Sequence, residues 1–499
     1  MSHPIHALYA NREIKAGRTA LIDGAVSLTH EALITAVEAA AGDLTRRGLG
    51  PGDRIGLCAR NSWSHVVGYL AILRAGAVWT PLNPRNGARL NGDFQARAGL
   101  ALTLVDASSK NAAGQSTRPL PLEDWLATLR PAPLPPVSDD PDAPVALKFT
   151  GGSTGVPKGV VQSQSSAAAA LRSLSAFYGF TAEDVNLAVA PLTHGSSHYI
   201  LPVLAAGGAH VLLAEPDRAA ILTELMSRVS VAFMPPTLIT LLMNEATFGP
   251  GDFPRLRHLT YSAAPMSADR IAAAIARFGP VLSTLYGQTE APMTIAGLSP
   301  AEMADPKLAA SVGSPFAETP VRLLTAADEV ITRGEGEVLV GGDLARTHYL
   351  DAPDLTAAAR HDGWLKTGDI GRIGDDGRLV LIGRSRDLII TGGYNVYPGE
   401  VEAALNRHPL VRDACAFSEP DDVWGERLEA AVAVGPDADA DAIIAFVRDE
   451  IGPVRTPKRL HLLDALPRNP VGKVVRDDVR ALCRTLFPPP PSRPLETAP

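Results

Sequence analysis

The segment from Leu147 to Val161 places glycines, hydroxyl side chains and a lysine directly after an apolar strand. Glycine lets backbone N–H groups come close to anionic oxygens, and the hydroxyls and the ammonium add donors and charge. Such a composition is typical of a phosphate-binding loop, although a Gly/Ser/Thr cluster alone is more often a flexible surface turn. The residues that we expect to bind phosphate here are Thr150, Gly151, Gly152, Ser153, Thr154, Gly155 and Lys158.

This loop does not match the P-loop of nucleoside triphosphatases. That pattern requires Gly immediately before Lys, and Pro157 precedes Lys158. A second candidate near the C-terminus has Gly472 before Lys473, but Pro467 and Val474 stand where the pattern needs Gly and Ser or Thr. We therefore exclude a Walker-type site.

Five motifs follow one another along the chain: TGGSTGVPKG, YGQTEAP, WLKTGDIG, GRSRDLIITGGYNVYPGEVE and PRNPVGKVV. In these motifs and their order the chain resembles the acyl-adenylate-forming superfamily, which includes acyl-CoA synthetases, aryl-CoA ligases, peptide-synthetase adenylation domains and firefly luciferase. The resemblance runs from roughly Leu21 to Leu482. It implies that a carboxylic acid reacts with ATP and Mg²⁺ to give an acyl-adenylate, and that the acyl group then passes to coenzyme A.

The resemblance implies roles for the residues around the nucleotide. The first motif would close over the β- and γ-phosphates. In YGQTEAP, Thr289 would bind the α-phosphate and Glu290 would help to hold Mg²⁺, which prefers hard oxygen ligands. Without the resemblance, Thr-Glu is only a helix start. The adenine side would be formed by Tyr286, Gly287, Gln288, Ala263, Ala264 and Pro265, with Ser262 standing where many relatives have Gly.

The later motifs contribute charged side chains. Asp369 matches the carboxylate that accepts both ribose hydroxyls, although Gly-Asp is also an ordinary hairpin turn. Arg384 would reach the ribose or a phosphate. Lys473 matches the catalytic lysine, whose ammonium stabilises the charge that builds up in the transition state. A lone Lys or Arg in such a position is otherwise an exposed, solvated side chain.

The two half-reactions share one pocket, and the resemblance implies how the protein separates them. The C-terminal domain would rotate about a hinge at Arg386. Lys473 would serve adenylation, and the segment Gly392, Gly393 and Tyr394 would serve the attack by the thiol.

The segment APLTHGSSHY carries the residues that we expect nearest to the acid. His194 matches a residue between the ATP site and the acid, and a packed, hydrogen-bonded histidine is the equally weighted alternative, which we favour for His198. The window 185–215 contains no Asp, which argues against an amino acid as the substrate. It also contains no Arg, which argues against a dicarboxylate substrate. Arg255 and Arg257 remain candidates for binding a second carboxylate. Small residues could leave room for an aryl or medium-chain acid: Gly195, Ser196, Ser197, Ala263 and Ala264.

Alternatives to a coenzyme A ligase remain at this stage. The acyl group could pass to a carrier-protein thiol or another nucleophile, and the acid could be an unusual one such as nitrite. From a different class, the chain could be a catalytically silent nucleotide-binding module. A homodimer is possible.

Alternating strands and helices must position these residues. From Val26 to Leu204 apolar runs alternate with helix-period segments, which predicts a layered α/β domain with parallel strands. A Pro- and Asp-rich stretch at 130–144 predicts an exposed connector, after which we expect a new structural unit. A second alternation runs from Val185 to roughly Val281.

The remaining third of the chain predicts a different architecture. Strand-like pieces beyond Pro315 with Asp-Gly turns indicate an antiparallel subdomain, and a compact βαβ-like region begins near Ser385. We therefore predict an α/β protein with three parts. They are a large N-terminal domain of layered α/β subdomains with a β-rich subdomain (1–384), a small mobile α+β C-terminal domain (385–484) and a disordered Pro-rich tail (485–499).

Composition limits the possible partners and the compartment. A length of 499 residues predicts two or more domains, and a net charge of −8 argues against nucleic acid or an anionic membrane surface. The three cysteines are far apart, so neither a metal cluster nor a disulfide framework is indicated. The longest apolar stretch, 199–214, is too short and too interrupted to span a bilayer. We expect a cytoplasmic protein.

Overall fold

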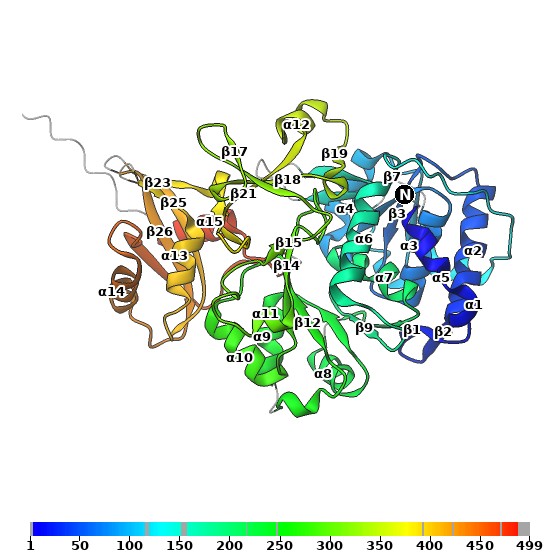
Figure 1. Ribbon diagram of the computed structural model, residues 1–499, viewed down its shortest axis with the longest axis horizontal. Helices are drawn as coiled ribbons and strands as arrows, with labels where there is room; N and C mark the ends of the chain where they lie inside the picture. Colours follow the sequence, from blue (N-terminus) through cyan, green and yellow to red (C-terminus); the bar gives the residue numbers. More distant parts are fainter. Residues whose placement is uncertain are drawn as a thin grey trace, which may run out of the picture. The chain divides into compact units, whose positions relative to one another are not determined.

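The computed structural model (Figure 1) describes residues 3–114, 119–150, 157–215, 217–245, 248–391, 394–421, 424–469 and 472–487. The chain divides into two compact units. Unit 1 consists of Met1–Thr367 with Arg372–Val380, and unit 2 of Gly368–Gly371 with Leu381–Pro499. The boundary after residue 384 therefore stays a prediction.

Among the described residues of unit 1, seven strands form one sheet, and they come from both sides of the Pro-rich connector. The central strands β4, β3 and β5 run parallel, as expected, and β7 after the connector pairs parallel with β4. The expectation of a new structural unit after residue 144 was wrong, because the connector only returns the chain to the same sheet. In spatial order the strands are β19 (Thr347–Tyr349), β8 (Lys158–Ser163), β7 (Pro144–Thr150), β4 (Val78–Leu82), β3 (Arg54–Cys58), β5 (Leu102–Val105) and β6 (Pro119–Pro121).

A nine-stranded sheet, again counted over the described part of unit 1, holds the second alternation. Strands β13, β12, β11, β9, β10 and β1 run parallel to one another, so their carboxyl ends share one edge. The order is β15 (Ser314–Pro315), β14 (Ala296–Leu298), β13 (Leu282–Tyr286), β12 (His258–Tyr261), β11 (Val231–Phe233), β9 (Val185–Ala188), β10 (Ala209–Leu212), β1 (Thr19–Asp23) and β2 (Val26–Thr29).

Helices pack between these two sheets. Helix α3 contacts β3 and β4 of one sheet and β1 of the other, while α6 contacts β7 and α7 contacts β10. Side chains before the helices cap their free N–H groups: the Ser62 hydroxyl accepts from His65 N and the Ser163 hydroxyl from Ser166 N. The helices of unit 1 are α1 (Arg12–Lys15), α2 (His30–Arg46), α3 (Trp63–Arg74), α4 (Gly87–Ala98), α5 (Leu122–Ala127), α6 (Gln164–Tyr178), α7 (Ile200–Ala205), α8 (Arg218–Ser227), α9 (Pro236–Glu245), α10 (Ala268–Phe278), α11 (Pro300–Met303) and α12 (Pro353–Ala358).

The predicted β-rich part is an antiparallel arrangement. Strand β16 pairs antiparallel with β17 and β18, and β20 pairs antiparallel with β21. Strand β22 also pairs with β21, and both strands contribute residues to each compact unit. The bounds are β16 (Val321–Leu324), β17 (Val330–Ile331), β18 (Gly334–Val340), β20 (Arg360–His361), β21 (Trp364–Ile373) and β22 (Leu379–Arg384).

Unit 2 is a small sheet with helices on both faces. Along β26, Ala430 and Val432 pack under α13 and α14, whereas Ala431 and Ala433 pack under α15, as the two-residue period of a strand requires. Helix α15 continues to Leu486, within the segment predicted to be a tail, and residues 488–499 lie outside the described part. The elements are β23 (Ile389–Thr391), β24 (Tyr394–Val396), β25 (Val411–Asp421), β26 (Gly425–Val434), β27 (Arg459–Leu463), α13 (Pro398–Leu405), α14 (Ala440–Ile451) and α15 (Arg476–Leu486).

The α/β fold class is confirmed, with a large N-terminal part, a β-rich subdomain and a smaller C-terminal domain. Within the described ranges, none of the helices has both the length and the apolar character needed to cross a membrane.

An ion pair between the buried Asp184 and the half-buried Arg257 fixes the beginning of β9. Asp184 accepts two hydrogen bonds of 2.8 Å from the Arg257 guanidinium, and a third of 2.7 Å from the Ser230 hydroxyl. Burial alone would raise the pKa of the Asp184 carboxyl, but these donors lower it below its usual value. Asp184 thus ties β9 to the segments before β11 and β12.

We expect Asp184→Asn to lower the unfolding free energy of unit 1 by about 3 kcal/mol, because the change leaves a guanidinium without its carboxylate. Since the folded pKa of Asp184 lies below the unfolded value of about 4, the carboxylate stabilises the fold above that pH, and this contribution disappears as the pH falls through the folded pKa. Thermal unfolding at pH 7 and pH 3 measures the difference.

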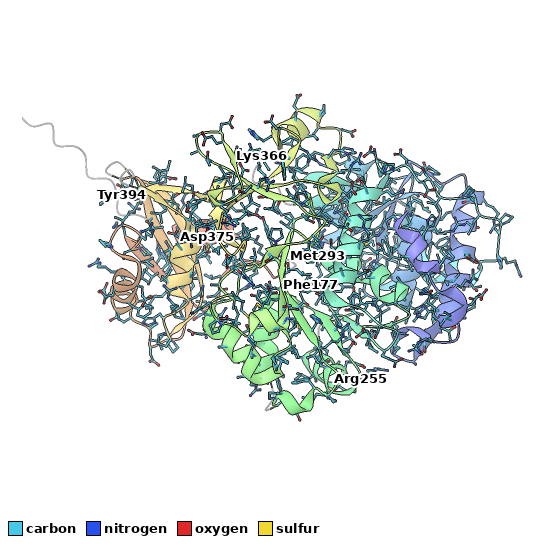
Figure 2. The ribbon with its side chains drawn as sticks, viewed as in Figure 1. Phe177, Arg255, Met293, Lys366, Asp375 and Tyr394 are labelled. Carbon is cyan, nitrogen blue, oxygen red and sulfur yellow. The ribbon has the colours of Figure 1, made fainter. Side chains whose placement is uncertain are left out.

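The matched control is Asp375→Asn, because the Asp375 side chain (Figure 2) is 100% exposed. Equal shifts of the unfolding midpoint in the two variants would contradict this account of Asp184.

Candidate active site

The loops that follow the carboxyl ends of parallel strands carry most of the predicted site residues of unit 1. His194 follows β9, Ala263 follows β12, and the segment 287–290 follows β13. Ligands of open α/β sheets bind at this edge, where the strand ends leave a crevice. The nine-stranded sheet therefore brings three motifs that are far apart in the sequence to one side of unit 1.

The loop after β13 is held by hydrogen bonds to its backbone. The buried Gln162 side chain of β8 donates to the Thr289 carbonyl at 2.8 Å, and the Thr347 hydroxyl of β19 donates to the Glu290 carbonyl at 2.8 Å. Gln288 Nε2 donates to the Thr367 carbonyl at 2.9 Å. These bonds leave the side chains of Thr289 and Glu290 partly exposed at the strand end.

Gly287 allows the same loop to turn back tightly. A Cβ at this position would lie 2.4 Å from the backbone nitrogen of Met293, so no other residue fits without moving the chain. Met293 is labelled in Figure 2. Tyr286, which we expected beside the adenine, is only 8% exposed at the end of β13.

Tyr349 joins two of the predicted site residues, and it belongs to no motif that the sequence analysis identified. Its hydroxyl donates to Glu290 Oε1 at 2.9 Å, and the Lys158 ammonium lies 5.5 Å from the centre of its ring. Burial and the neighbouring carboxylate raise the pKa of Tyr349, so the phenol keeps its proton at neutral pH. Strand β19 pairs antiparallel with β8, and this pairing is what brings Tyr349 beside Lys158.

The phosphate loop lies between Thr150, the last residue of β7, and Lys158, the first residue of β8. The loop residues that we predicted to bind phosphate, Gly151, Gly152, Ser153, Thr154 and Gly155, lie outside the described residues. The two strands that carry them are adjacent and antiparallel, with Thr150 opposite Lys158.

His194 is a neutral, oriented imidazole. Its Nδ1 donates to the Thr193 carbonyl at 3.0 Å, so its Nε2 accepts from the Asn83 amide at 3.3 Å. The side chain keeps access to solvent, yet desolvation by surrounding protein and the charge of Lys148 lower its pKa to about 4. Both predicted features of His194, a packed histidine and a residue near the acid, are compatible with this arrangement.

The small residues do not all leave open space. A Cβ on Gly195 would lie 3.1 Å from the Met293 sulfur and 3.2 Å from the Phe233 ring, so these side chains already occupy the space beside it. Ser196 and Ser197 are buried, whereas Ala263 is exposed and Ala264 half-buried.

Ala263 adopts a strained backbone in the loop after β12. Its φ is 73°, in the left-handed region that non-glycine residues rarely occupy. Such strain persists only where the surroundings impose it and is typical of functional loops. Ser262 before it is 8% exposed, and Pro265 after it is exposed.

In unit 2 the two predicted ribose or phosphate ligands contact each other. The Arg384 guanidinium lies 3.0 Å from Asp369 Oδ1, and the Asp369 side chain is 8% exposed against 38% for Arg384. The Ser385 hydroxyl donates to the Gly368 carbonyl at 3.2 Å. The contact with Arg384 orients the Asp369 carboxylate.

Lys473 sits in a tight loop of the same unit. Its backbone nitrogen donates to Asn469 Oδ1 at 2.9 Å, and its carbonyl accepts from Asn469 N at 2.8 Å. The side chain keeps access to solvent, while partial desolvation and the positive Arg384 lower its pKa. The loop fixes the Lys473 backbone and leaves its amino group open to a ligand.

The predicted thiol segment is described only in part. Tyr394 opens β24 and is 60% exposed (Figure 2), whereas Gly392 and Gly393 lie outside the described residues. The rotation about Arg386 stays a prediction.

Few side chains in the part of the chain that the structure describes are placed to bind a metal ion. No group of three or more His, Cys, Asp or Glu side chains there is arranged to hold a metal ion. Glu290 keeps one carboxylate oxygen beyond the Tyr349 bond, and this single hard donor suits Mg²⁺, which takes its remaining ligands from water and phosphate.

Two family models match the chain. The model described as AMP-binding enzyme matches residues 9–350, and the AMP-binding enzyme C-terminal domain matches residues 400–473.

Two relatives illustrate the similarity of sequence. The medium/long-chain-fatty-acid–CoA ligase FadD8 of Mycobacterium tuberculosis is 34% identical over 71% of this chain, a match that spans 64% of that protein, less than two thirds of its length. The feruloyl-CoA synthase of an Amycolatopsis species is 31% identical over 93% of this chain and 95% of its own length.

Solved structures extend the similarity to the fold. The amide bond synthetase McbA from Marinactinospora thermotolerans superposes with a TM-score of 0.86 at 29% identity, covering 96% of this chain and 99% of that one. ATP-bound MatB from Rhodopseudomonas palustris gives a TM-score of 0.88 at 26% identity, covering 98% of this chain and 100% of that one.

We expect Ala263→Val to lower the unfolding free energy by about 2 kcal/mol, because a β-branched residue tolerates a positive φ worse than Ala does. Ala263→Gly should cause no loss, since Gly adopts this φ without strain. Thermal unfolding of both variants checks the expectation. The neighbouring Ala264→Val serves as the control, and an equal loss at both positions would show that backbone strain is not the cause.

Proposed function

Because this chain belongs to the AMP-binding enzyme family, within the acyl-adenylate-forming superfamily, we propose that it is an acid–thiol ligase. It activates a carboxylic acid with ATP, releases pyrophosphate and transfers the acyl group to coenzyme A. The proposed acid is an aryl or medium-chain carboxylic acid, and the proposed location is the cytoplasm, in keeping with three free, buried cysteines in the described residues.

One observation carries the proposal. The strands of two different sheets bring Lys158, Tyr349 and Glu290 into contact at the carboxyl end of β13, beside the backbone of Thr289. A cation, a carboxylate and a hydroxyl side by side are the groups that a nucleoside triphosphate with a divalent cation requires. A merely structural loop would not need this combination at a strand end.

In the first half-reaction an oxygen of the substrate carboxylate attacks the α-phosphorus of ATP, and the bond to pyrophosphate breaks. The protein has to orient the reactants and neutralise charge, and no general base is needed because the carboxylate is already ionised. Thr289 is proposed to donate to the α-phosphate, Asp369 to accept from the ribose hydroxyls, and Lys473 to supply positive charge in the transition state.

Magnesium is proposed to bind through Glu290. Bound Mg²⁺ would neutralise phosphate charge during the transfer. The Tyr349 hydroxyl orients the carboxylate by donating to Oε1, which leaves Oε2 for the ion.

In the second half-reaction a thiolate attacks the acyl carbonyl carbon, and the bond from this carbon to the phosphate oxygen breaks. AMP leaves as an anion, and the same donors stabilise the charge on its phosphate. Coenzyme A is the proposed thiol. Transfer to an amine is a second candidate, favoured by the similarity of fold to a protein named as an amide bond synthetase.

ATP–pyrophosphate exchange with aryl, medium-chain and dicarboxylic acids tests the proposal. At least one acid should support exchange, and adding coenzyme A should yield AMP and a thioester, whereas an amine alone should yield little product. If no acid in the panel supports exchange, adenylation is not the function. If an amine is acylated faster than coenzyme A, the second candidate is correct.

Within the same experiment, Lys473→Ala should reduce exchange by about 100-fold or more, as expected for the loss of one transition-state charge contact. It should largely spare thioester formation from supplied acyl-adenylate. The exposed Lys307 gives the matched control, Lys307→Ala, which should retain full activity. Equal loss in both half-reactions would contradict the role given to Lys473.

Tyr349→Phe should raise the Mg²⁺ concentration for half-maximal exchange by about 10-fold, because the oriented Glu290 carboxylate loses its hydrogen bond. Saturating Mg²⁺ should restore most of the rate. A rate loss that Mg²⁺ does not rescue would place Tyr349 in a different role.

A further inference from the structure

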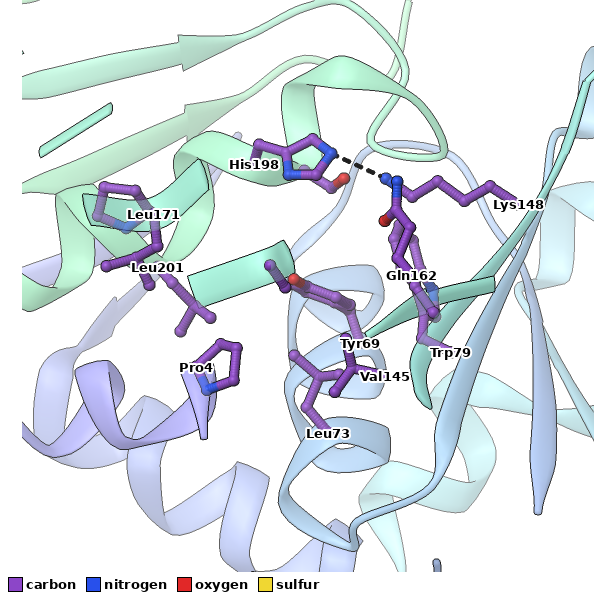
Figure 3. Close-up of a pocket in the computed structure, with 14 residues that line it drawn as sticks. Pro4, Tyr69, Leu73, Trp79, Val145, Lys148, Gln162, Leu171, His198 and Leu201 are labelled. Carbon is purple, nitrogen blue, oxygen red and sulfur yellow. Dashed lines mark hydrogen bonds between the residues drawn. The ribbon is translucent and has the colours of Figure 1, made fainter. Parts of the chain in front are cut away.

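A pocket in unit 1 lies between the seven-stranded sheet and the helices that pack on it (Figure 3). It encloses about 490 Å³ of empty space, including its opening to solvent. Helices α3, α6 and α7 and strands β4, β7 and β8 contribute to its wall, most of which is apolar: Pro4, Tyr69, Leu73, Trp79, Val145, Ala146, Ala167, Leu171, Leu201 and Pro202. Four polar residues complete it: Lys148, Gln162, Ser197 and His198.

Lys148 is a buried cation that lacks a carboxylate partner among the described residues. Only 8% of the residue is exposed, and its Nζ lies 3.0 Å from His198 Nε2 and 5.2 Å from the centre of the Trp79 ring. Desolvation lowers the pKa of Lys148 to about 7, and burial with the charge of Lys148 lowers that of His198 well below its usual value. Because a lysine donates, the neutral His198 accepts at Nε2 and carries its proton on Nδ1.

Trp79 supplies an unsatisfied donor in the same wall. It is 2% exposed, and its indole N–H is buried with no hydrogen-bond partner in the described structure. A buried donor without an acceptor costs free energy, and an isolated buried ammonium costs more. The pocket therefore collects hydrogen-bond donors and one cation in an apolar wall, which is complementary to an anionic acceptor.

Several residues of the pocket wall are close in sequence, or hydrogen-bonded, to residues of the candidate site. Lys148 lies two residues before Thr150 on β7, and Gln162 also holds the Thr289 carbonyl. Ser197 and His198 belong to the short helix Gly195–Tyr199 that follows His194, and the charge of Lys148 reaches His194 as well. Two of the predicted segments, Leu147–Val161 and APLTHGSSHY, therefore contribute residues to this wall.

Resting on the proposed adenylation, we propose that Lys148, with Trp79, determines specificity for an acid that carries a second carboxylate. One carboxylate of this acid reacts with ATP near His194. The other binds in the pocket against the Lys148 ammonium, and the Trp79 N–H donates to it. A substrate with a methyl group in this place would leave the cation unpaired.

The arginines left open by the sequence do not compete for this role. Arg257 donates to both oxygens of Asp184 and to the Tyr178 carbonyl, and Arg255 (Figure 2) donates to the Glu183 carbonyl. The window 185–215 contains no Arg. The positive charge that could bind a second carboxylate comes from Lys148 on strand β7, outside this window.

Pairs of acids that differ only at the distal end test the proposal by pyrophosphate exchange. Adipic acid is compared with hexanoic acid, and terephthalic acid with 4-methylbenzoic acid, while 5-oxohexanoic acid offers a neutral acceptor. In at least one pair the diacid should have a kcat/KM at least about 10-fold higher. Preference for the methyl member in both pairs, or equal use of the oxo acid and adipic acid, would overturn the proposal.

Variants of Lys148 and Trp79 test whether these side chains cause the preference for a diacid. Lys148→Met, of similar length and without charge, should lower kcat/KM for the preferred diacid by about 100-fold and change that for its methyl partner by less than 3-fold. Trp79→Phe keeps a ring and removes the N–H, and should lower the diacid value by about 5-fold. Equal losses on both acids of a pair in Lys148→Met would overturn the role of Lys148.

A measurement on the unaltered protein is independent of the folding of these variants and of catalysis. Reductive methylation at pH 7, followed by peptide mass spectrometry, reports the reactivity of Lys148. The preferred diacid should protect Lys148, and its methyl partner should not. Absence of protection by either diacid would overturn the inference even if exchange is observed, and protection without exchange would refute the proposed function alone.

Discussion

The hydrogen bond from the Gln162 side chain to the Thr289 carbonyl joins the two sheets of unit 1 at the candidate site. Gln162 is 2% exposed, so its amide has no water to bond and must be satisfied by the loop. The bond from Thr347 to the Glu290 carbonyl adds a second tie from the neighbouring strand. Because these bonds use backbone carbonyls, the side chains of the loop remain available to a ligand.

Charged side chains of the candidate site are paired within each unit. In unit 1 the carboxylate of Glu290 and the cation of Lys158 share Tyr349, and in unit 2 Asp369 and Arg384 pair at 3.0 Å. Each carboxylate is held by a hydrogen-bond donor, which fixes its orientation. The protein's net charge of −8 therefore does not prevent anion binding, which depends on local donors.

Lys148 is energetically the most unusual group of unit 1. A buried ammonium that bonds only a neutral imidazole among the described residues loses most of its hydration, which is why its pKa falls to about 7. Apolar residues of similar volume usually stabilise such a position more than a charge does. A bound anion would explain a lysine at this position, because its interaction with the ammonium would offset the free energy of hydration lost on burial.

The sequence alone determined the family and the α/β class, and it led to the prediction of individual site residues. All of these depend on local patterns: strand and helix periods, a glycine-rich loop, and Thr289, Asp369 and Lys473 within short motifs. The sequence could not determine partners that sheet pairing brings together. The connector at 130–144 suggested a new unit, yet β7 joins β4. Tyr349 reaches Glu290 only because β19 pairs with β8. Lys148 of β7 meets His198 only because the fold brings the short helix Gly195–Tyr199 beside this strand. Contacts between residues distant in sequence depend on the register and order of strands, which no local pattern encodes.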